Sequence, residues 1–306
     1  MSARLATVAG SLALAGALGV GLWTWASRDG RTSPPAVRSN ANTAIERPAT
    51  PTQVQELRER LHHELQPVRL ENCTMTRFGE ANDGGYLMCG NLLEVEAGYS
   101  YGINNYDGWG CRVATQLGVP VHQYDCFDTR VPPCATGETQ FHPECVAGRA
   151  FTDSEGRRFD SVAAQLARNG HEGRRVVMKM DVEGAEWDSL LETPREVLER
   201  IDQLALEFHG VDKDTWKYYL VVTKLKDVFH IVHLHFNNHG CKPGLEPFPS
   251  YAYEVLLVNK RLGVPSADTS PVRRPHALDA PSNPELPDCQ YVRDLPSDPG
   301  KARAAR

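Results

Sequence analysis

The sequence predicts an α/β protein with a doubly wound, mostly parallel sheet that ends in an antiparallel hairpin. From residue 78 onward, short apolar runs alternate with helical patterns, which is typical of a parallel sheet with helices on both faces. The last two apolar runs, residues 230–236 and 253–259, have no helical pattern between them. Strands connected in this way indicate an antiparallel edge on an otherwise parallel sheet.

Composition and charge are those of an ordinary globular protein. The chain has 306 residues, of which 41% are hydrophobic and 24% are charged, so it is long enough for one large α/β domain. The net charge of −6 excludes the basic surface that nucleic-acid-binding proteins need. We therefore expect no nucleic-acid partner.

The expected elements follow one another in a regular order. Helices are predicted from the capping signal Thr52/Gln55, from Asp160 to Gly170, from the signal Thr193-Pro194-x-Glu196, and over residues 212–228. Strands are predicted at residues 99–103, 119–124, 141–146, 175–180 and 204–208, before the two final strands.

The N-terminus carries a membrane or export signal. Residues 5–26 form a run of 22 residues without a charge, which is long enough to span a bilayer core of about 30 Å, and Trp23 and Trp25 suit an interfacial belt. We expect an uncleaved single-pass anchor that attaches the protein to a membrane. The alternative is a cleaved signal peptide and a secreted protein.

The remaining chain divides into three parts. Residues 27–52 are rich in Ser, Thr, Asn, Ala and Pro and predict a flexible stalk. Residues 53–262 form the predicted domain. Residues 263–306 form a Pro-rich tail, of which the stretch 278–295 could wrap the domain.

The chain contains eight cysteines and no CxxC pair, so a zinc ribbon or a thioredoxin motif is not expected. An exported domain could pair them as disulfides, for which Cys126, Cys134 and Cys145 are the best candidates. Buried free thiols are the alternative.

Polar residues follow the first two predicted strands, where open α/β sheets bind ligands. Gly102, Asn104 and Asn105 lie in a glycine-bearing loop that either approaches a ligand closely or is an ordinary tight turn. Asp125 ends the second strand, where a carboxylate can accept two hydrogen bonds from a ribose diol. Asp128 competes for this role, and a helix N-cap is the structural alternative.

Charged residues also follow the strands at 175–180 and 204–208. Asp181 and Glu183 are interpreted as site residues, whereas Glu186 could lie on a solvated helix face. Glu207 and His209 share one face of their strand, and His209 is a plausible general base. The spacing of these residues and of the histidines at 233–239 matches no zinc signature, so no metal site is predicted.

Taken together, several segments resemble the FkbM and methyltransferase-like-protein-24 branch of S-adenosylmethionine-dependent methyltransferases. The most specific segment is MKMDVEGAEWDSLL at residues 178–191. The others are FGEANDGGYLMC (78–89), YSYGINNYDGWG (99–110), VHQYDCFD (121–128), LEFHG (206–210), NNHGC (237–241) and YEVLLVNK (253–260).

This resemblance implies a Rossmann-like, class I methyltransferase sheet of seven strands with S-adenosylmethionine over the first two. It implies that Gly102, Asn104 and Asn105 face the methionine part, that Asp125 holds the ribose and that Asp83 helps to close the pocket. Asp181 would stand beside the sulfonium and the acceptor, with Glu183 close by. His209 is then the first candidate for the general base and Asp181 the second.

The implied reaction is O-methylation of a sugar or another hydroxylated small molecule. The first loop departs from the wider superfamily, since Gly-Ile-Asn replaces the usual glycine-rich sequence. Two other functions stay open. One is an anchored binding or scaffold domain without catalysis, and the other is a Rossmann-like sugar-nucleotide transferase.

Overall fold

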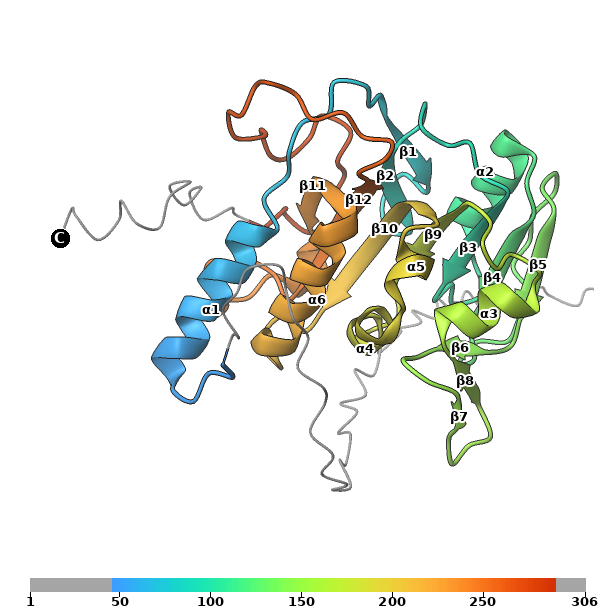
Figure 1. The fold of residues 1–306 in the computed structure, drawn as a ribbon, viewed down its shortest axis with the longest axis horizontal. Helices are drawn as coiled ribbons and strands as arrows, with labels where there is room; N and C mark the ends of the chain where they lie inside the picture. Colours follow the sequence, from blue (N-terminus) through green and yellow to red (C-terminus); the bar gives the residue numbers. More distant parts are fainter. Residues whose placement is uncertain (1–45, 290–306) are drawn as a thin grey trace, which may run out of the picture.

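The computed structural model describes residues 46–289 (Figure 1). Within this range the chain forms six α-helices and twelve strands around one seven-stranded sheet. In chain order the elements are α1 (Pro51–Glu64), β1 (Met75–Gly79), β2 (Gly85–Cys89), β3 (Ala97–Tyr101), α2 (Gly108–Leu117), β4 (Val121–Tyr124), β5 (Thr139–His142), β6 (Cys145–Val146), β7 (Phe151–Thr152), β8 (Arg158–Asp160), α3 (Val162–Arg168), β9 (Val176–Met180), α4 (Glu186–Glu192), α5 (Arg195–Leu198), β10 (Ile201–His209), α6 (Thr215–Val228), β11 (Phe229–Phe236) and β12 (Ala252–Asn259).

The main sheet is mixed, with the strand order β11-β12-β10-β9-β3-β4-β5. Strands β10, β9, β3, β4 and β5 run parallel, whereas β12 pairs antiparallel with both of its neighbours, β10 and β11. Five of the nine strand pairs in the described residues are parallel and four are antiparallel. The prediction of a mostly parallel, Rossmann-like sheet of the class I methyltransferase type is therefore wrong, because antiparallel pairing extends beyond the terminal hairpin.

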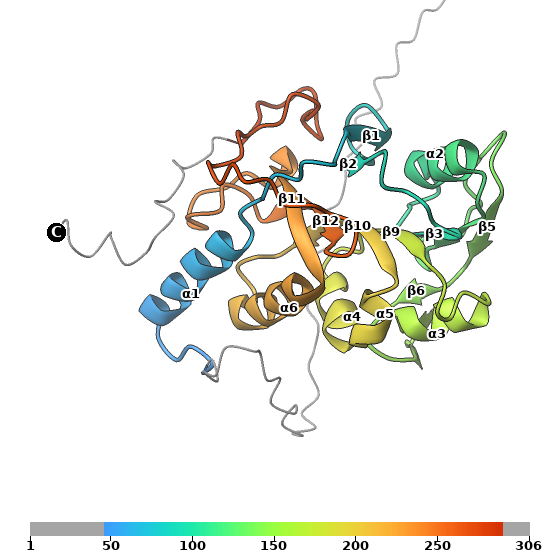
Figure 2. The same ribbon diagram turned by 45° about the horizontal axis from the view of Figure 1, so that its top comes forward.

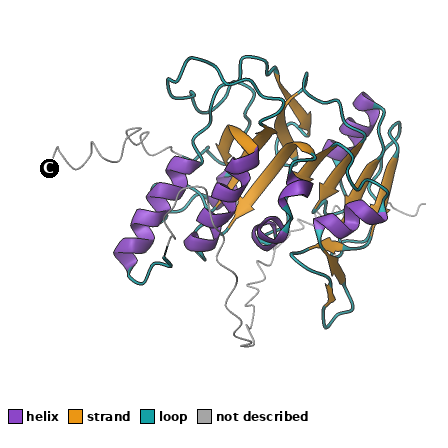
Figure 3. Cartoon of the chain, viewed as in Figure 1, coloured by secondary structure: helices purple, strands orange, loops and turns teal. Residues whose placement is uncertain are grey.

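The two faces of the sheet are covered differently, so the predicted doubly wound arrangement is also wrong. Helices α1, α3, α4, α5 and α6 pack on one face, and the other face carries α2 and the β1–β2 hairpin (Figure 2). The connections from β4 to β5 and from β11 to β12 contain no α-helix (Figure 3). Because an apolar hairpin covers part of the second face, α2 is the one α-helix of the described residues that packs there.

The β1–β2 hairpin brings its apolar side chains onto the sheet. Phe78, Tyr86 and Met88 are buried there with Trp109 of α2. Arg77 holds the turn, donating from Nε to the Glu80 carbonyl at 2.7 Å and from Nη2 to the Asn82 carbonyl at 2.7 Å. This fixed turn determines where Tyr86 points.

Helix α1 begins earlier than the sequence predicts. Thr50, not Thr52, is the N-cap, and it forms a capping box with Gln53. Pro51 then occupies the first helical position, where its missing N–H is not needed.

All eight cysteines lie in the described residues and form four disulfides. Cys126 and Cys145, two of the three best candidates, are joined to each other, and Cys134 is joined to Cys111. The remaining disulfides are Cys73–Cys89 and Cys241–Cys289. Formation of these bonds requires an oxidising environment.

The tail lies on the same side of the sheet as the hairpin, as far as residue 289 (Figure 2). His233 of β11 contacts Asp279 at 2.7 Å, and Asn238 donates from Nδ2 to the carbonyl of Asn283 at 2.8 Å. The Cys241–Cys289 disulfide attaches residue 289 to the segment that follows β11. The tail therefore covers polar side chains of the last strands.

The expectation of a single-pass membrane protein needs correction. Among residues 46–289 no helix combines the length and apolar character needed to cross a bilayer. The longest, α1 and α6, have 14 residues each, or about 21 Å, against a bilayer core of about 30 Å. The predicted anchor, residues 5–26, and most of the predicted stalk lie outside the described residues.

Replacing Cys241 and Cys289 together by serine is expected to lower the free energy of unfolding by about 2–4 kcal/mol, because the disulfide closes a long loop. Urea denaturation of the oxidised protein measures this change. The same variant under reducing conditions is the control. Unchanged stability would show that the tail is held by its polar contacts alone.

Candidate functional site

A row of ionisable side chains crosses four neighbouring strands on the hairpin-covered face. His235 of β11 and Glu207 of β10 both lie directly opposite Glu254 of β12. Asp181 follows β9, one step beyond the pair Leu206–Met180 that joins β10 to β9. The carboxyl ends of β9 and β10 therefore bring their charged residues to one edge of the sheet.

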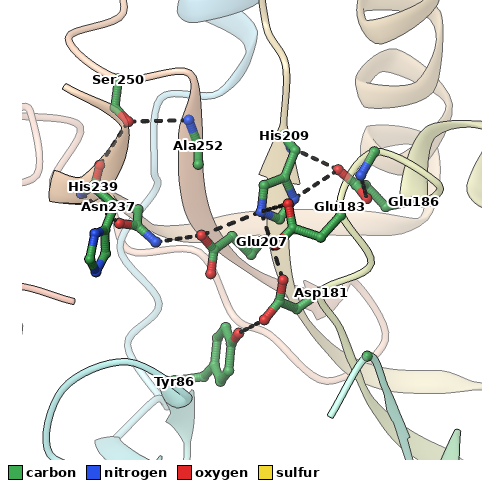
Figure 4. Close-up of polar contacts among 12 residues, drawn as sticks. Tyr86, Asp181, Glu183, Glu186, Glu207, His209, Asn237, His239, Ser250 and Ala252 are labelled. Carbon is green, nitrogen blue, oxygen red and sulfur yellow. Dashed lines mark hydrogen bonds and ion pairs between the residues drawn. The ribbon is translucent and has the colours of Figure 1, made fainter. Parts of the chain in front are cut away.

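Asp181 is held by residues from three elements (Figure 4). Tyr86 donates its hydroxyl hydrogen to Oδ2 at 3.0 Å, and the Lys179 ammonium lies 3.4 Å from the same atom. Oδ1 lies 3.8 Å from His209 Nε2. Because its side chain is 24% exposed, Asp181 can be reached from solvent.

His209 is surrounded by carboxylates. Its Nδ1 lies 3.2 Å from Glu186 Oε1, and its Nε2 lies 3.6 Å from Glu207 Oε1 and 3.7 Å from Glu183 Oε2. Burial disfavours the charged imidazolium, but Glu186, Glu207 and Asp181 outweigh this effect and raise the pKa of His209 to about 10. The imidazole therefore carries a proton at neutral pH.

Glu207 is a buried carboxylate. Asn237 donates to its Oε1 at 2.6 Å. Burial and the nearby charge of Asp181 raise the pKa of Glu207. The pKa of Asp83, in the turn between β1 and β2, is raised by the same two causes. Both carboxyl groups therefore hold a proton more readily than they would in water.

The other sequence-predicted residues lie around this cluster. Glu183 stands at its open side with an 86% exposed side chain and a positive φ of 55°. Glu186, which the sequence allowed on a solvated face, is fully buried and accepts from the backbone N–H groups of Gly184 and His209.

Close contact with the Asp181 backbone requires a glycine at position 102. Its φ is +72°, and a Cβ atom there would lie 1.7 Å from the Asp181 carbonyl oxygen. Its own carbonyl accepts a hydrogen bond from Lys179 at 2.5 Å. The loop after β3 therefore packs directly against the start of the predicted Asp181–Glu183 motif.

Asp125 holds this loop from the other side. Its Oδ2 accepts from the backbone N–H groups of Ile103 and Asn104 at 3.0 and 2.9 Å, and its Oδ1 accepts from those of Phe127 and Asp128 at 2.8 and 3.1 Å. These four bonds occupy the capacity of the carboxylate. The structure thus gives Asp125 a loop-anchoring position.

Asn104 and Asn105 both adopt positive φ angles, 41° and 62°, in the anchored loop. Such backbone is uncommon outside glycine and is seen most often with asparagine and aspartate. Asn105 donates from Nδ2 to Asp128 at 3.0 Å. The loop is thus held in a defined shape beside the strand ends.

The sequence interpretation missed three participants. Tyr86 and Lys179 contact Asp181, and Glu254 extends the row of charges. Lys179 and Asp181 are two residues apart, so the period of a strand places them on one face. No local signal identifies Tyr86 or Glu254, because the first depends on how the hairpin packs on the sheet and the second on the pairing of β12 with β10.

A surface depression of about 460 Å³ lies beside α2 and is lined in part by Glu80, Tyr106 and Arg112. Its lining contains none of the strand-end carboxylates among the described residues. It is therefore distinct from the charged row.

Comparisons with known proteins give no assignment. No protein-family model matches the chain, and a search of curated proteins finds no match.

Replacing Asp125 by alanine is expected to lower the free energy of unfolding by at least about 2 kcal/mol, because four backbone N–H groups lose their acceptor. Urea denaturation measures this loss, and Asp188→Ala on the exposed side of α4 is the control. Unchanged stability together with lost ligand binding would instead assign Asp125 to a ligand.

Stability is expected to fall as the pH rises from about 6.5 to about 9, because His235 binds its proton more tightly in the folded state. Burial lowers the pKa of His235, but Glu254, Asp279 and Asp288 raise it overall to about 9. This contribution is complete below the unfolded-state pKa and is lost as the pH approaches the folded-state value; it amounts to about 3 kcal/mol.

Urea denaturation at several pH values tests this slope. His235→Gln is expected to remove the His235 contribution and leave a flatter profile. An equally steep profile in the variant would assign the pH dependence to other groups.

Proposed function

We propose that the chain is an S-adenosylmethionine-dependent methyltransferase that acts on a hydroxyl group of a sugar or another small molecule. The proposal is supported by the contact between two predicted motifs at the carboxyl edge of the sheet. The loop of Gly102 packs on the backbone of Asp181, and Asp181 faces His209. A donor-binding loop and an acceptor-activating cluster must be adjacent in this reaction.

The residues at this edge of the sheet fit the sulfonium end of S-adenosylmethionine better than they fit its ribose. Asp181 is partly exposed and stands next to the loop that contains Asn104 and Asn105. Asp125 could accept a ribose diol only by releasing backbone N–H groups that it already binds. We therefore assign the acceptor side to Asp181, Glu183 and His209, and leave the ribose without an assigned partner.

When bound, S-adenosylmethionine supplies a methyl group that its sulfonium already activates. The residues of this chain then have to orient the acceptor hydroxyl and take its proton. Asp181 is suited to take the proton, because it is accessible and is held in place by Tyr86. His209 is protonated at neutral pH and so orients and stabilises the neighbouring carboxylates.

Binding of the donor is the first test. Calorimetric titration of S-adenosylmethionine and S-adenosylhomocysteine into the protein is expected to show saturable binding. If a folded sample binds neither compound, the proposal fails. A nucleotide sugar with Mn²⁺ then tests the sugar-nucleotide transferase, and failure of that ligand would favour the non-catalytic binding domain.

Replacing Asp181 by asparagine is expected to lower kcat by about 10²- to 10⁴-fold, because the acceptor loses its general base. Donor affinity should change little, since the substituted group is nearly isosteric. The assay is methyl transfer from labelled donor to acceptors found in a screen of hydroxylated sugars. Asp188→Asn on α4 is the matched control. Undiminished turnover in the Asp181 variant would exclude it as the base.

A further inference from the structure

Three side chains at the carboxyl ends of β9 and β10 have the composition of a metal site. One ligand atom each from Asp181, Glu207 and His209 can be chosen so that all three lie within 4.8 Å of one another. Two carboxylate oxygens and one imidazole nitrogen suit divalent cations of the Mn²⁺, Fe²⁺ and Zn²⁺ type. Glu207 and His209 are buried, whereas Asp181 opens to solvent.

Each of the three side chains is oriented by a second group. Glu186 binds the Nδ1 side of His209, which leaves Nε2 directed at Asp181 and Glu207 (Figure 4). Asn237 holds Glu207, and Tyr86 holds Asp181. A carboxylate on the far nitrogen of a histidine, and hydrogen bonds on the carboxylate ligands, are regular features around protein-bound metals.

A second observation also indicates a cation. Glu254 is only 5% exposed and lies directly across the antiparallel pair from Glu207. Like charges at directly opposed positions destabilise a sheet, and burial strengthens their repulsion. A cation between the strand ends would offset this cost.

Among the described residues, the charge partner of Glu254 is a histidine. Its recorded partner among them is His235 Nδ1 at 3.8 Å, which is longer than a hydrogen bond, and that nitrogen has no hydrogen-bond partner. The Lys179 ammonium pairs with Asp181 at 3.4 Å and donates to the carbonyls of Tyr101 and Gly102. Among the described residues, the ion-pair partners of the two opposed carboxylates are thus histidines alone, His235 for Glu254 and His209 for Glu207 at 3.6 Å.

We propose that Asp181, Glu207 and His209 bind a divalent cation of the Mn²⁺ type, which displaces the proton of His209 Nε2 into solvent, and that Glu254 adds negative charge behind this site. The cation completes its coordination with water or with oxygen atoms of a bound ligand on the open side of Asp181. This inference concerns metal binding alone and does not depend on methyl transfer. Either proposal can fail while the other stands.

Mn²⁺ alone is the probe, added to the metal-free protein. Electron paramagnetic resonance counts free and bound Mn²⁺ and yields the dissociation constant. Glu207→Gln and His209→Gln are each expected to weaken binding by at least about tenfold, because each removes a ligand. Asp188→Asn removes one exposed carboxylate on α4 and should leave the affinity unchanged. Near-ultraviolet circular dichroism checks the fold of every variant.

The unsubstituted protein provides an independent readout. Electron spin echo envelope modulation of bound Mn²⁺ is expected to show a directly coordinated imidazole nitrogen. Binding to exposed carboxylates alone cannot give this nitrogen signal. Absence of saturable Mn²⁺ binding, absence of the nitrogen signal, or equal affinity in well-folded Glu207→Gln would overturn the proposal. Metal binding without S-adenosylmethionine binding would overturn only the proposed methyltransferase.

Discussion

The burial of ionisable side chains in one row across the sheet is the constraint on which the rest of the structure depends. His235, Glu254 and Glu207 are cross-strand neighbours, and Asp181 continues the row. Charged groups in such a position are costly unless they are paired or bound. The hairpin contributes Tyr86 and the tail contributes Asp288 to this pairing, so the two segments that cover this part of the sheet also supply partners for its charges.

The same constraint explains the loop that follows β3. Gly102 must lack a side chain so that the loop can rest on the Asp181 backbone, and Asp125 fixes the opposite side of the loop with four hydrogen bonds. Contacts within the protein thus fix the shape of the loop. Preorganised geometry of this kind suits a site that has to position two reactants, because little ordering remains to be done on binding.

Local sequence patterns predicted the strands of the main sheet well. They predicted poorly which segments cover the faces of this sheet. The runs at 175–180 and 204–208 became β9 and β10, since period and apolar content are local properties. The hairpin at residues 75–89 was not foreseen as the cover of a face, because its role depends on packing against strands that are distant in the sequence. In the site, Asp181, Glu183 and His209 converge, but Asp125 anchors a loop, Glu186 is buried, and Glu254 was missed. A carboxylate after a strand looks the same in sequence whether it binds a ligand or its own backbone.

We infer that the edge formed by Asp181, Glu207 and His209 is the functional centre of the protein. A crystal structure of the protein soaked with Mn²⁺ and S-adenosylhomocysteine, recorded with anomalous scattering, tests this directly. We expect an anomalous peak between these three side chains, and homocysteine density against the Gly102 loop on the side of Asp181. Ligand density only elsewhere, such as in the depression beside α2, would contradict it.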